Sequence, residues 1–159
     1  MSTKLPKPGG KIRDRNVTLG DGRATRLSDL SGKKGMILYF YPRDNTPGCT
    51  TEACEFQERL DPLAGRGYSV VGVSTDSEKS HTRFSEKHGL EFPLIVDADH
   101  RLSESCGAWA EKKSFGKTSQ GIVRTTLILD RDLKVLKIYE KVKASGHASA
   151  VLADLEGME

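Results

Sequence analysis

The feature that most constrains the fold of this chain is the segment that follows the apolar run Met36–Tyr41. Continuous apolar residues over such a length are typical of a strand that is buried on both faces. A proline cannot donate a ladder hydrogen bond, so Pro42 turns the chain out of the sheet. Thr46 is a favoured helix N-cap, and Pro47 suits the first helical position. The sequence therefore predicts a strand, a loop and a helix, with Cys49 in or just before the first helical turn.

The predicted position of Cys49 decides the chemistry of its thiol. A cysteine at a helix start faces unpaired backbone N–H groups and the positive end of the helix dipole. Both favour the thiolate over the thiol, and the thiolate is the nucleophile. The other interpretation is a small buried apolar residue, which free cysteines often are. The residues that precede Cys49 favour the reactive thiol, because they place it at a helix start.

The spacing of Pro42, Thr46 and Cys49 resembles the active-site pattern Pro-x-x-x-Thr-x-x-Cys of the peroxiredoxins. Cys54 completes the pattern Cys-Thr-x-Glu-x-Cys, which resembles the peroxiredoxin Q branch, also called the bacterioferritin comigratory protein branch. The resemblance covers nearly the whole chain, from about Leu5 to Leu155, and continues through residues 108–117, 121–126 and 141–147.

The resemblance implies a thioredoxin-like α/β fold in a single domain over residues 1–159. The order of elements predicted from periodicity and turn residues agrees, with a central mixed β-sheet flanked by helices and an N-terminal β-hairpin. The predicted strands are Val17–Leu19, Ala24–Leu27, Met36–Tyr41, Ser69–Thr75, Phe92–Asp97, Thr125–Leu129 and Leu133–Tyr139. Helices are expected from Pro47 to a break near Asp61 caused by Pro62, and over Ser77–His88, Arg101–Trp109 and Gly146–Glu156. Residues Glu111–Gly121 are expected to form a charged loop.

The resemblance also implies a role for each residue around Cys49. The Cys49 thiolate attacks one peroxide oxygen and becomes a sulfenic acid. Thr46 offers its hydroxyl to the peroxide, and the backbone N–H groups near Gly48 bind the oxygens as a helix start binds anions. Pro42 shields the thiolate from water. Arg124 is expected to stabilise the thiolate and the charge on the leaving oxygen, although a solvent-exposed arginine at a strand start is the alternative.

Cys54 is the resolving thiol by the same resemblance, and it forms an intramolecular disulfide with Cys49. Its alternative is a core cysteine beside Ala53 and Phe56. Cys106 stands where members of the branch usually carry tyrosine. We interpret Cys106 as a small buried residue, with the alternative that it is a second disulfide partner.

The implied disulfide conflicts with the predicted helix. Residues five apart in a regular helix have Cα atoms roughly 8.6 Å apart, and they point to different sides. A disulfide needs Cα atoms within about 7 Å. Cys49 and Cys54 therefore cannot bond while the segment between them is helical, and the helix start is expected to unwind after oxidation. Gly48, Thr50 and Thr51 are weak helix formers, which favours such unwinding.

Other site chemistries find less support in the sequence. Cys-x₄-Cys is not a zinc spacing, and a general dithiol oxidoreductase favours Cys-x-x-Cys. His81 and His88 are expected to border the apolar face of their helix near solvent, without a ligand partner, so no metal and no cofactor are predicted. The functional alternative to a peroxidase is a peroxide-sensing or holdase-like thiol protein that uses the same cysteines without efficient turnover.

Composition limits the partners. The net charge is +3, and the basic excess lies before residue 35, where no aromatic residue interleaves with it as single-strand nucleic-acid binding requires. No stretch approaches the roughly 18 apolar residues of a membrane helix, and no apolar leader opens the chain. We therefore expect a cytoplasmic monomer with reduced thiols, no nucleic-acid or membrane partner, peroxide as substrate and thioredoxin or a similar dithiol as reductant.

Overall fold

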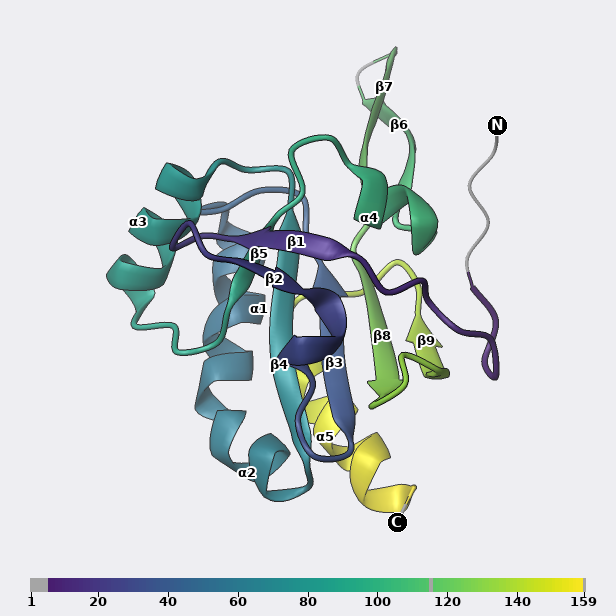
Figure 1. Ribbon diagram of the computed structural model, residues 1–159. Helices are drawn as coiled ribbons and strands as arrows, with labels where there is room; N and C mark the ends of the chain where they lie inside the picture. Colours follow the sequence, from purple (N-terminus) through teal and green to yellow (C-terminus); the bar gives the residue numbers. More distant parts are fainter. Residues whose placement is uncertain (1–5, 115, 159) are drawn as a thin grey trace.

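The computed structural model describes residues 6–114 and 116–158, and its framework is a seven-stranded sheet in the order β2-β1-β5-β4-β3-β8-β9. The strands of this sheet are β1 (Asn16–Leu19), β2 (Ala24–Arg26), β3 (Gly35–Phe40), β4 (Tyr68–Ser74), β5 (Leu94–Val96), β8 (Thr125–Asp130) and β9 (Val135–Tyr139). The α-helices are α1 (Pro47–Glu58), α2 (Leu60–Gly65), α3 (Glu78–His88), α4 (Arg101–Ser105) and α5 (His147–Gly157), and a 3₁₀ turn, η1, covers Leu27–Leu30. Figure 1 shows β3 and β4 at the centre of the molecule.

The sheet is mixed, as the sequence predicts. β3 pairs in parallel with β4 and antiparallel with β8, and β4 pairs in parallel with β5. β1 joins β5 and β2 in antiparallel fashion, which confirms the N-terminal hairpin. The late hairpin is also confirmed, since β8 pairs antiparallel with β9. Strand β3 thus lies inside the sheet, between β4 and β8, and the loop that leaves its carboxyl end carries the predicted site.

Strand β3 divides the core into two layers, because its side chains alternate between the faces of the sheet. Met36, Leu38 and Phe40 belong to one apolar cluster, together with residues of η1 and α4. Ile37 and Tyr39 belong to the other cluster, which is covered by α1, α2, α3 and α5. Every residue of β3 is buried, as the continuous apolar run predicts. Helices therefore cover both faces of the sheet.

The predicted break near Pro62 is present, a few residues earlier than expected. α1 ends at Glu58, and Arg59 serves as the junction to α2, which begins at Leu60. Pro62 lies in the first turn of α2, where a backbone N–H has no intrahelical partner and a proline costs little. The proline therefore starts a second helix instead of ending the first.

Two predictions for the segment after β5 are wrong. α4 ends at Ser105 and not at Trp109, because Gly107 adopts φ +73° and turns the chain. The segment expected to be a charged loop is instead an antiparallel hairpin, β6 (Trp109–Ser114) with β7 (Lys117–Ile122), that projects from the body in Figure 1. Most of β7 is exposed, so no alternating apolar pattern marked this hairpin in the sequence.

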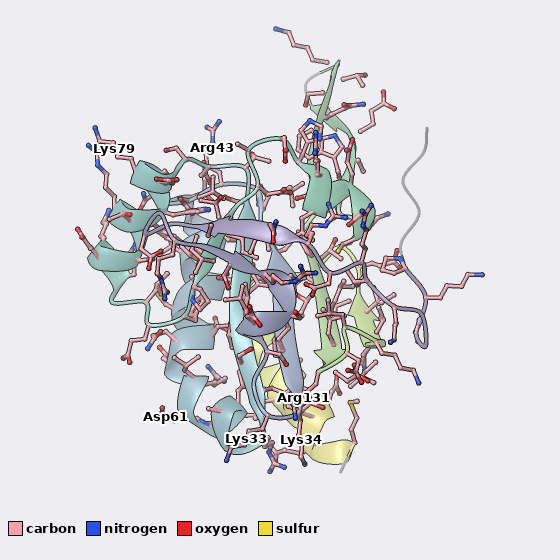
Figure 2. The ribbon with its side chains drawn as sticks, in the orientation of Figure 1. Lys33, Lys34, Arg43, Asp61, Lys79 and Arg131 are labelled. Atoms are coloured by element: carbon pink, nitrogen blue, oxygen red, sulfur yellow. The ribbon has the colours of Figure 1, made fainter. Side chains whose placement is uncertain are left out.

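The basic residues near the N-terminus are distributed, not gathered. Arg23 pairs with Asp21 and Arg26 with Asp14, while Lys33 and Lys34 lie together just before β3, at the lower end of Figure 2. This distribution agrees with a solvated face. Within the described residues, no helix is long and apolar enough to cross a membrane.

Candidate active site

Cys49 lies in the first turn of α1, as the sequence predicts. Thr46 is the N-cap residue, with extended backbone, and Pro47 is the first helical residue. Only 1% of Cys49 is exposed, and its sulfur belongs to the apolar cluster between the sheet and α1. A thiol at this position meets the free N–H groups of the helix start inside an otherwise apolar surrounding.

Arg124 is distant from Cys49 in sequence but lies beside it in the fold. Its Nη2 lies 3.3 Å from Cys49 Sγ, and its Nη1 lies 2.6 Å from Oε1 of Glu52. Arg124 stands just before β8, whose first residue pairs with Phe40 at the end of β3. The antiparallel register therefore delivers the guanidinium to the point where α1 begins. The alternative of a solvent-exposed strand-start arginine is wrong, since 16% of the Arg124 side chain is exposed.

Gly48 provides the room for this contact. A Cβ atom at Gly48 would lie 3.2 Å from Nη2 of Arg124 and 3.8 Å from the Cβ of Ala144. The guanidinium therefore packs almost directly on the backbone of the first helical turn. A side chain at this position would push Arg124 away from the sulfur of Cys49.

Glu52 is a site residue to which sequence reasoning gave no role. Its side chain is fully buried, and burial raises the pKa of Glu52 to about 7 against the opposing effect of Arg124. Within the described residues, its Oε2 has no hydrogen-bond partner. The sequence feature that could have identified Glu52 is its spacing, since a residue three positions after Cys49 lies on the same face of the helix. Arg124 thus holds two acidic groups, a carboxyl and a thiol, with one guanidinium.

Thr46 is placed at the helix start but does not cap it with its side chain. Its hydroxyl donates instead to the carbonyl of Arg43, at 2.9 Å, which closes a tight turn before α1. The expected side-chain cap is therefore wrong. Because the proton of the hydroxyl is used, the oxygen faces other partners as an acceptor. Pro42 lies half-buried at the start of the same loop.

Cys54 lies on α1 together with Cys49, and both thiols are free. Cys54 is half-buried, so it is not a full member of the core, although Ala53 and Phe56 beside it are. Burial and then the neighbouring Glu58 raise the pKa of the Cys54 thiol. The helix is continuous between the two cysteines, which is the reduced geometry that the sequence predicts.

Cys106 lies far from this site in the fold. It is fully buried in the apolar cluster on the opposite face of the sheet, beside Leu102 and Ala108. Burial raises the pKa of its thiol to about 12. The interpretation as a small buried residue is confirmed, and the sheet separates Cys106 from Cys49.

Two buried histidines lie near the site, His81 on α3 and His147 at the start of α5. His81 is fully buried and bonded to Asp44, so the prediction that it borders solvent is wrong; the sequence pattern of α3 did not reveal a partner in a distant loop. His147 opens α5, and its Nε2 lies 2.8 Å from Oγ1 of Thr126. Burial and then the charge of Arg124 lower the pKa of His147 to about 4, which keeps this ring neutral at pH 7.

The AhpC/TSA family matches residues 8–138, and the chain belongs to this family. Within it, the chain falls in the Bcp or peroxiredoxin Q branch. Peroxiredoxin Bcp of Bacillus subtilis (strain 168) is 42% identical over 150 residues, 94% of this chain and 95% of that protein. Peroxiredoxin Bcp of Escherichia coli (strain K12) is 40% identical over 132 residues, 83% and 84% of the two chains.

Solved structures show the same fold. A cysteine-to-serine mutant of peroxiredoxin Q from Xylella fastidiosa superposes with a TM-score of 0.91 at 33% identity, covering 98% of both chains. The bacterioferritin comigratory protein of Xanthomonas campestris, a structure that concerns alkyl peroxide reduction, gives a TM-score of 0.86 at 38% identity, covering 98% of both chains. The thioredoxin-like fold predicted from the sequence is therefore confirmed, and the family's activity is that of a thiol peroxidase.

Proposed function

We propose that this protein reduces hydrogen peroxide and organic hydroperoxides through a Cys49 sulfenic acid, which Cys54 resolves and thioredoxin or a similar dithiol reduces. The observation that carries the proposal is the 3.3 Å contact between Nη2 of Arg124 and Sγ of Cys49 at the start of α1. A guanidinium held beside a sulfur at a helix start favours the thiolate. It also lies where negative charge develops on the peroxide oxygens during the reaction. The alkyl peroxide reduction described for the Xanthomonas campestris relative supports the organic substrates.

In the first step, the Cys49 thiolate attacks one peroxide oxygen and the O–O bond breaks. The sulfur gains an oxygen as sulfenic acid, and the other oxygen leaves as hydroxide or alkoxide and takes up a proton. Arg124 and the N–H groups of the first turn face the oxygens, so they stabilise the leaving charge. The Thr46 hydroxyl donates its proton to the backbone carbonyl of Arg43, so its oxygen accepts a hydrogen bond from the peroxide and orients it.

In the second step, the Cys54 thiol attacks the sulfenic sulfur, an S–S bond forms and water leaves. Both thiols lie on the folded α1, where their separation exceeds the reach of a disulfide. The start of α1 therefore unwinds before the bond forms. Unwinding also exposes Cys54, the pKa of which is raised in the folded helix by burial and then by Glu58.

In the third step, a dithiol reductant attacks the disulfide, both protein thiols are restored and the reductant becomes a disulfide. The pairing within one chain needs no second subunit, which supports a monomer as the working unit. Reduced thioredoxin is the candidate reductant, and a cytoplasmic location follows the same requirement for a reducing compartment.

A steady-state assay tests this proposal with wild type, Cys49→Ser and Cys54→Ser. We expect peroxide-dependent turnover with a thioredoxin system for wild type and none for Cys49→Ser. Cys54→Ser is expected to consume one equivalent of peroxide and then stop. Stoichiometric oxidation of wild type without turnover would contradict the proposal and favour the alternative of a peroxide sensor.

A further inference from the structure

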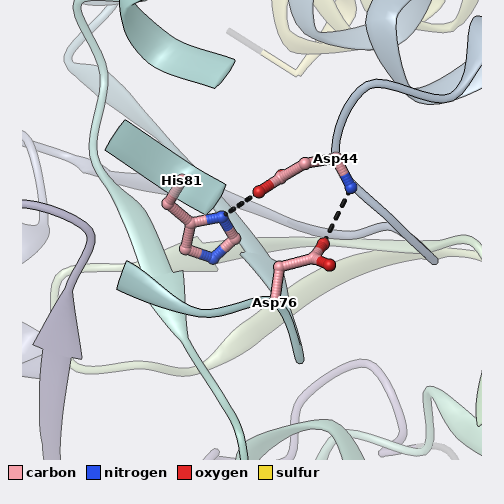
Figure 3. A group of neighbouring side chains, drawn as sticks. All are labelled: Asp44, Asp76 and His81. Atoms are coloured by element: carbon pink, nitrogen blue, oxygen red, sulfur yellow. Dashed lines mark hydrogen bonds and ion pairs between the residues drawn. The ribbon is translucent and has the colours of Figure 1, made fainter. Parts of the chain in front are cut away.

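A buried polar cluster lies behind the loop that joins β3 to α1. It consists of Asp44 in that loop, Asp76 after β4 and His81 on α3, and Figure 3 shows the three side chains turned toward one another. His81 is fully buried and Asp44 is 5% exposed. The proposed function assigns nothing to these residues, although Asp44 lies two positions before Thr46.

Asp44 is bonded on every side. Its Oδ1 accepts from the Tyr41 hydroxyl at 2.6 Å, and its Oδ2 accepts from the Ser80 hydroxyl at 2.8 Å. Nδ1 of His81 lies 2.7 Å from the same Oδ2. The backbone N–H of Asp44 donates to Oδ2 of Asp76 at 2.7 Å. Through Asp44 the loop is thus fastened to the residues that follow β3 and β4 and to α3.

The bonds of His81 show that a proton lies between it and Asp44. Nε2 of His81 is 2.8 Å from the carbonyl of Ile95, and a carbonyl only accepts, so Nε2 carries a proton. Nδ1 faces a carboxyl group that already accepts from two hydroxyls. The 2.7 Å contact between Nδ1 of His81 and Oδ2 of Asp44 is therefore a hydrogen bond, which ties the ring to the loop.

The same distances argue against a metal ion in this cluster. Two ligand atoms at about 2.1 Å from a tetrahedral metal are roughly 3.4 Å apart. Nδ1 of His81 and Oδ2 of Asp44 are 2.7 Å apart, which is a hydrogen-bond distance. Oδ2 of Asp76 is also used, by the backbone of Asp44 and by the hydroxyl of Ser74. The cluster is a satisfied hydrogen-bond network.

The network ends next to the residue that faces the peroxide. Asn45 follows Asp44 with φ +62°, a left-handed conformation that asparagine tolerates. Thr46 then turns its hydroxyl back to the carbonyl of Arg43, on the other side of Asp44. The position of Asp44 therefore sets the turn on which the Thr46 oxygen is mounted, while Arg124 reaches Cys49 independently of this loop.

We infer that Asp44 and His81 are positioning residues, which hold the loop so that Thr46 orients the peroxide for attack by Cys49. This inference rests on the proposed function. It assigns the pair to peroxide orientation and not to the generation of the thiolate, because neither residue contacts Cys49 or Arg124. A small displacement of an orienting group lowers the rate steeply, by about 10- to 100-fold for an ångström.

Two rates on the same protein test the inference. The first is the rate of Cys49 oxidation by hydrogen peroxide in a single turnover, which needs the Thr46 loop. The second is the rate of Cys49 alkylation by iodoacetamide, which needs the thiolate but no peroxide orientation. His81→Asn is expected to slow oxidation about 10-fold or more. It is expected to leave alkylation within about twofold of wild type, because the Arg124 contact stays.

The chain offers a matched control and a rescue. His88→Asn makes the same change on the same helix at a half-buried ring that packs on Phe84, and it is expected to change neither rate. Asp44→Asn keeps a carbonyl acceptor for Tyr41 and offers an N–H donor to Nδ1 of His81, so it is expected to retain more oxidation activity than Asp44→Ala. Ser80→Ala, which removes one bond from Asp44, serves as the mild variant if His81→Asn does not fold.

The outcomes separate the inference from the function on which it rests. Unchanged oxidation in folded His81→Asn, or an equal fall of both rates, would overturn the positioning role. Equal activity of Asp44→Asn and Asp44→Ala would overturn it as well. Wild-type protein whose Cys49 reacts with peroxide no faster than free cysteine would overturn the proposed function itself.

Discussion

Cys49 and Cys106 are both buried thiols, and they lie on opposite faces of the same sheet. Cys49 stands in the first turn of α1 with a guanidinium nitrogen 3.3 Å from its sulfur. Cys106 follows the last residue of α4, and the Ser105 hydroxyl lies 4.0 Å from its sulfur. Burial raises the pKa of Cys106 to about 12.

The two cysteines therefore differ in their charged and polar partners and not in their burial. Burial disfavours any charge, so a buried thiolate needs a compensating positive partner. At Cys49 the helix start and Arg124 supply that partner. At Cys106 burial outweighs the Ser105 hydroxyl and the charge of Arg15, which act in the opposite direction. Mutations that remove or preserve the charged partner of each thiol test this contrast.

Replacing each cysteine in turn should separate the two roles most strongly. Cys49→Ser is expected to abolish peroxide reduction, because it removes the nucleophile. Cys106→Ala is expected to leave the rate within about twofold and to lower the free energy of unfolding by about 1 kcal/mol through lost packing. Peroxide consumption and urea unfolding measure the two effects. Peroxidase activity that depended on Cys106 would invert the assignment.

Removing the positive partner of Cys49 should have the next largest effect. Arg124→Ala is expected to lower the rate of sulfenic acid formation about 100-fold, since a charge-stabilising donor is lost. The rate for Arg124→Lys should lie between those of wild type and Arg124→Ala, because an ammonium keeps the charge but lacks the forked donors that reach both Cys49 and Glu52. Stopped-flow oxidation measures these rates. Arg43→Ala is the control, since that side chain is exposed and points away from the body of the molecule in Figure 2; an equal loss there would argue against a specific contact.

Oxidation should unwind the start of α1, which carries Cys49, and leave α4 beside Cys106 unchanged. Disulfide formation between Cys49 and Cys54 is expected to reduce the hydrogen-exchange protection of amides from Thr50 to Phe56, because the helix must unwind. Amides of α4 next to Cys106 should keep their protection. Exchange followed by mass spectrometry on reduced and peroxide-treated protein compares the two. Equal protection of 50–56 in both states would contradict either the pairing or the unwinding.

The smallest expected effect concerns the carboxyl group that shares Arg124 with Cys49. Burial raises the pKa of Glu52 from 4.5 to about 7, so the folded state binds its proton more tightly than the unfolded state does. This contribution to stability is present below pH 4.5 and is lost as the pH rises to about 7. Glu52→Gln should lack this pH-dependent contribution. Between pH 5 and pH 8, the free energy of unfolding measured in urea should therefore fall more for wild type than for the variant. An equal loss in both would mean that Glu52 is ionised throughout.

Local rules were sufficient to predict the frame of the site. The apolar run up to Tyr41, the turn at Pro42 and the helix start at Pro47 depend on backbone preferences that act within a few residues. They placed Cys49 correctly in the first turn of α1. The same rules missed the β6–β7 hairpin, because its largely exposed strands carry no apolar alternation for a local pattern to detect.

Contacts between distant residues were decided by the tertiary structure. Arg124 is 75 residues from Cys49 in sequence, and only its resemblance to a family pattern connected the two before the register of β8 on β3 brought them together. His81 meets Asp44 across 37 residues, and no periodicity on α3 indicates that partner. The face on which Cys106 lies likewise depends on how α4 packs on the sheet. The sequence by itself determined where Cys49 stands on its helix, because the backbone preferences at a helix start are local. Its charge partners and the support of its loop depend on chain topology, which no local pattern encodes.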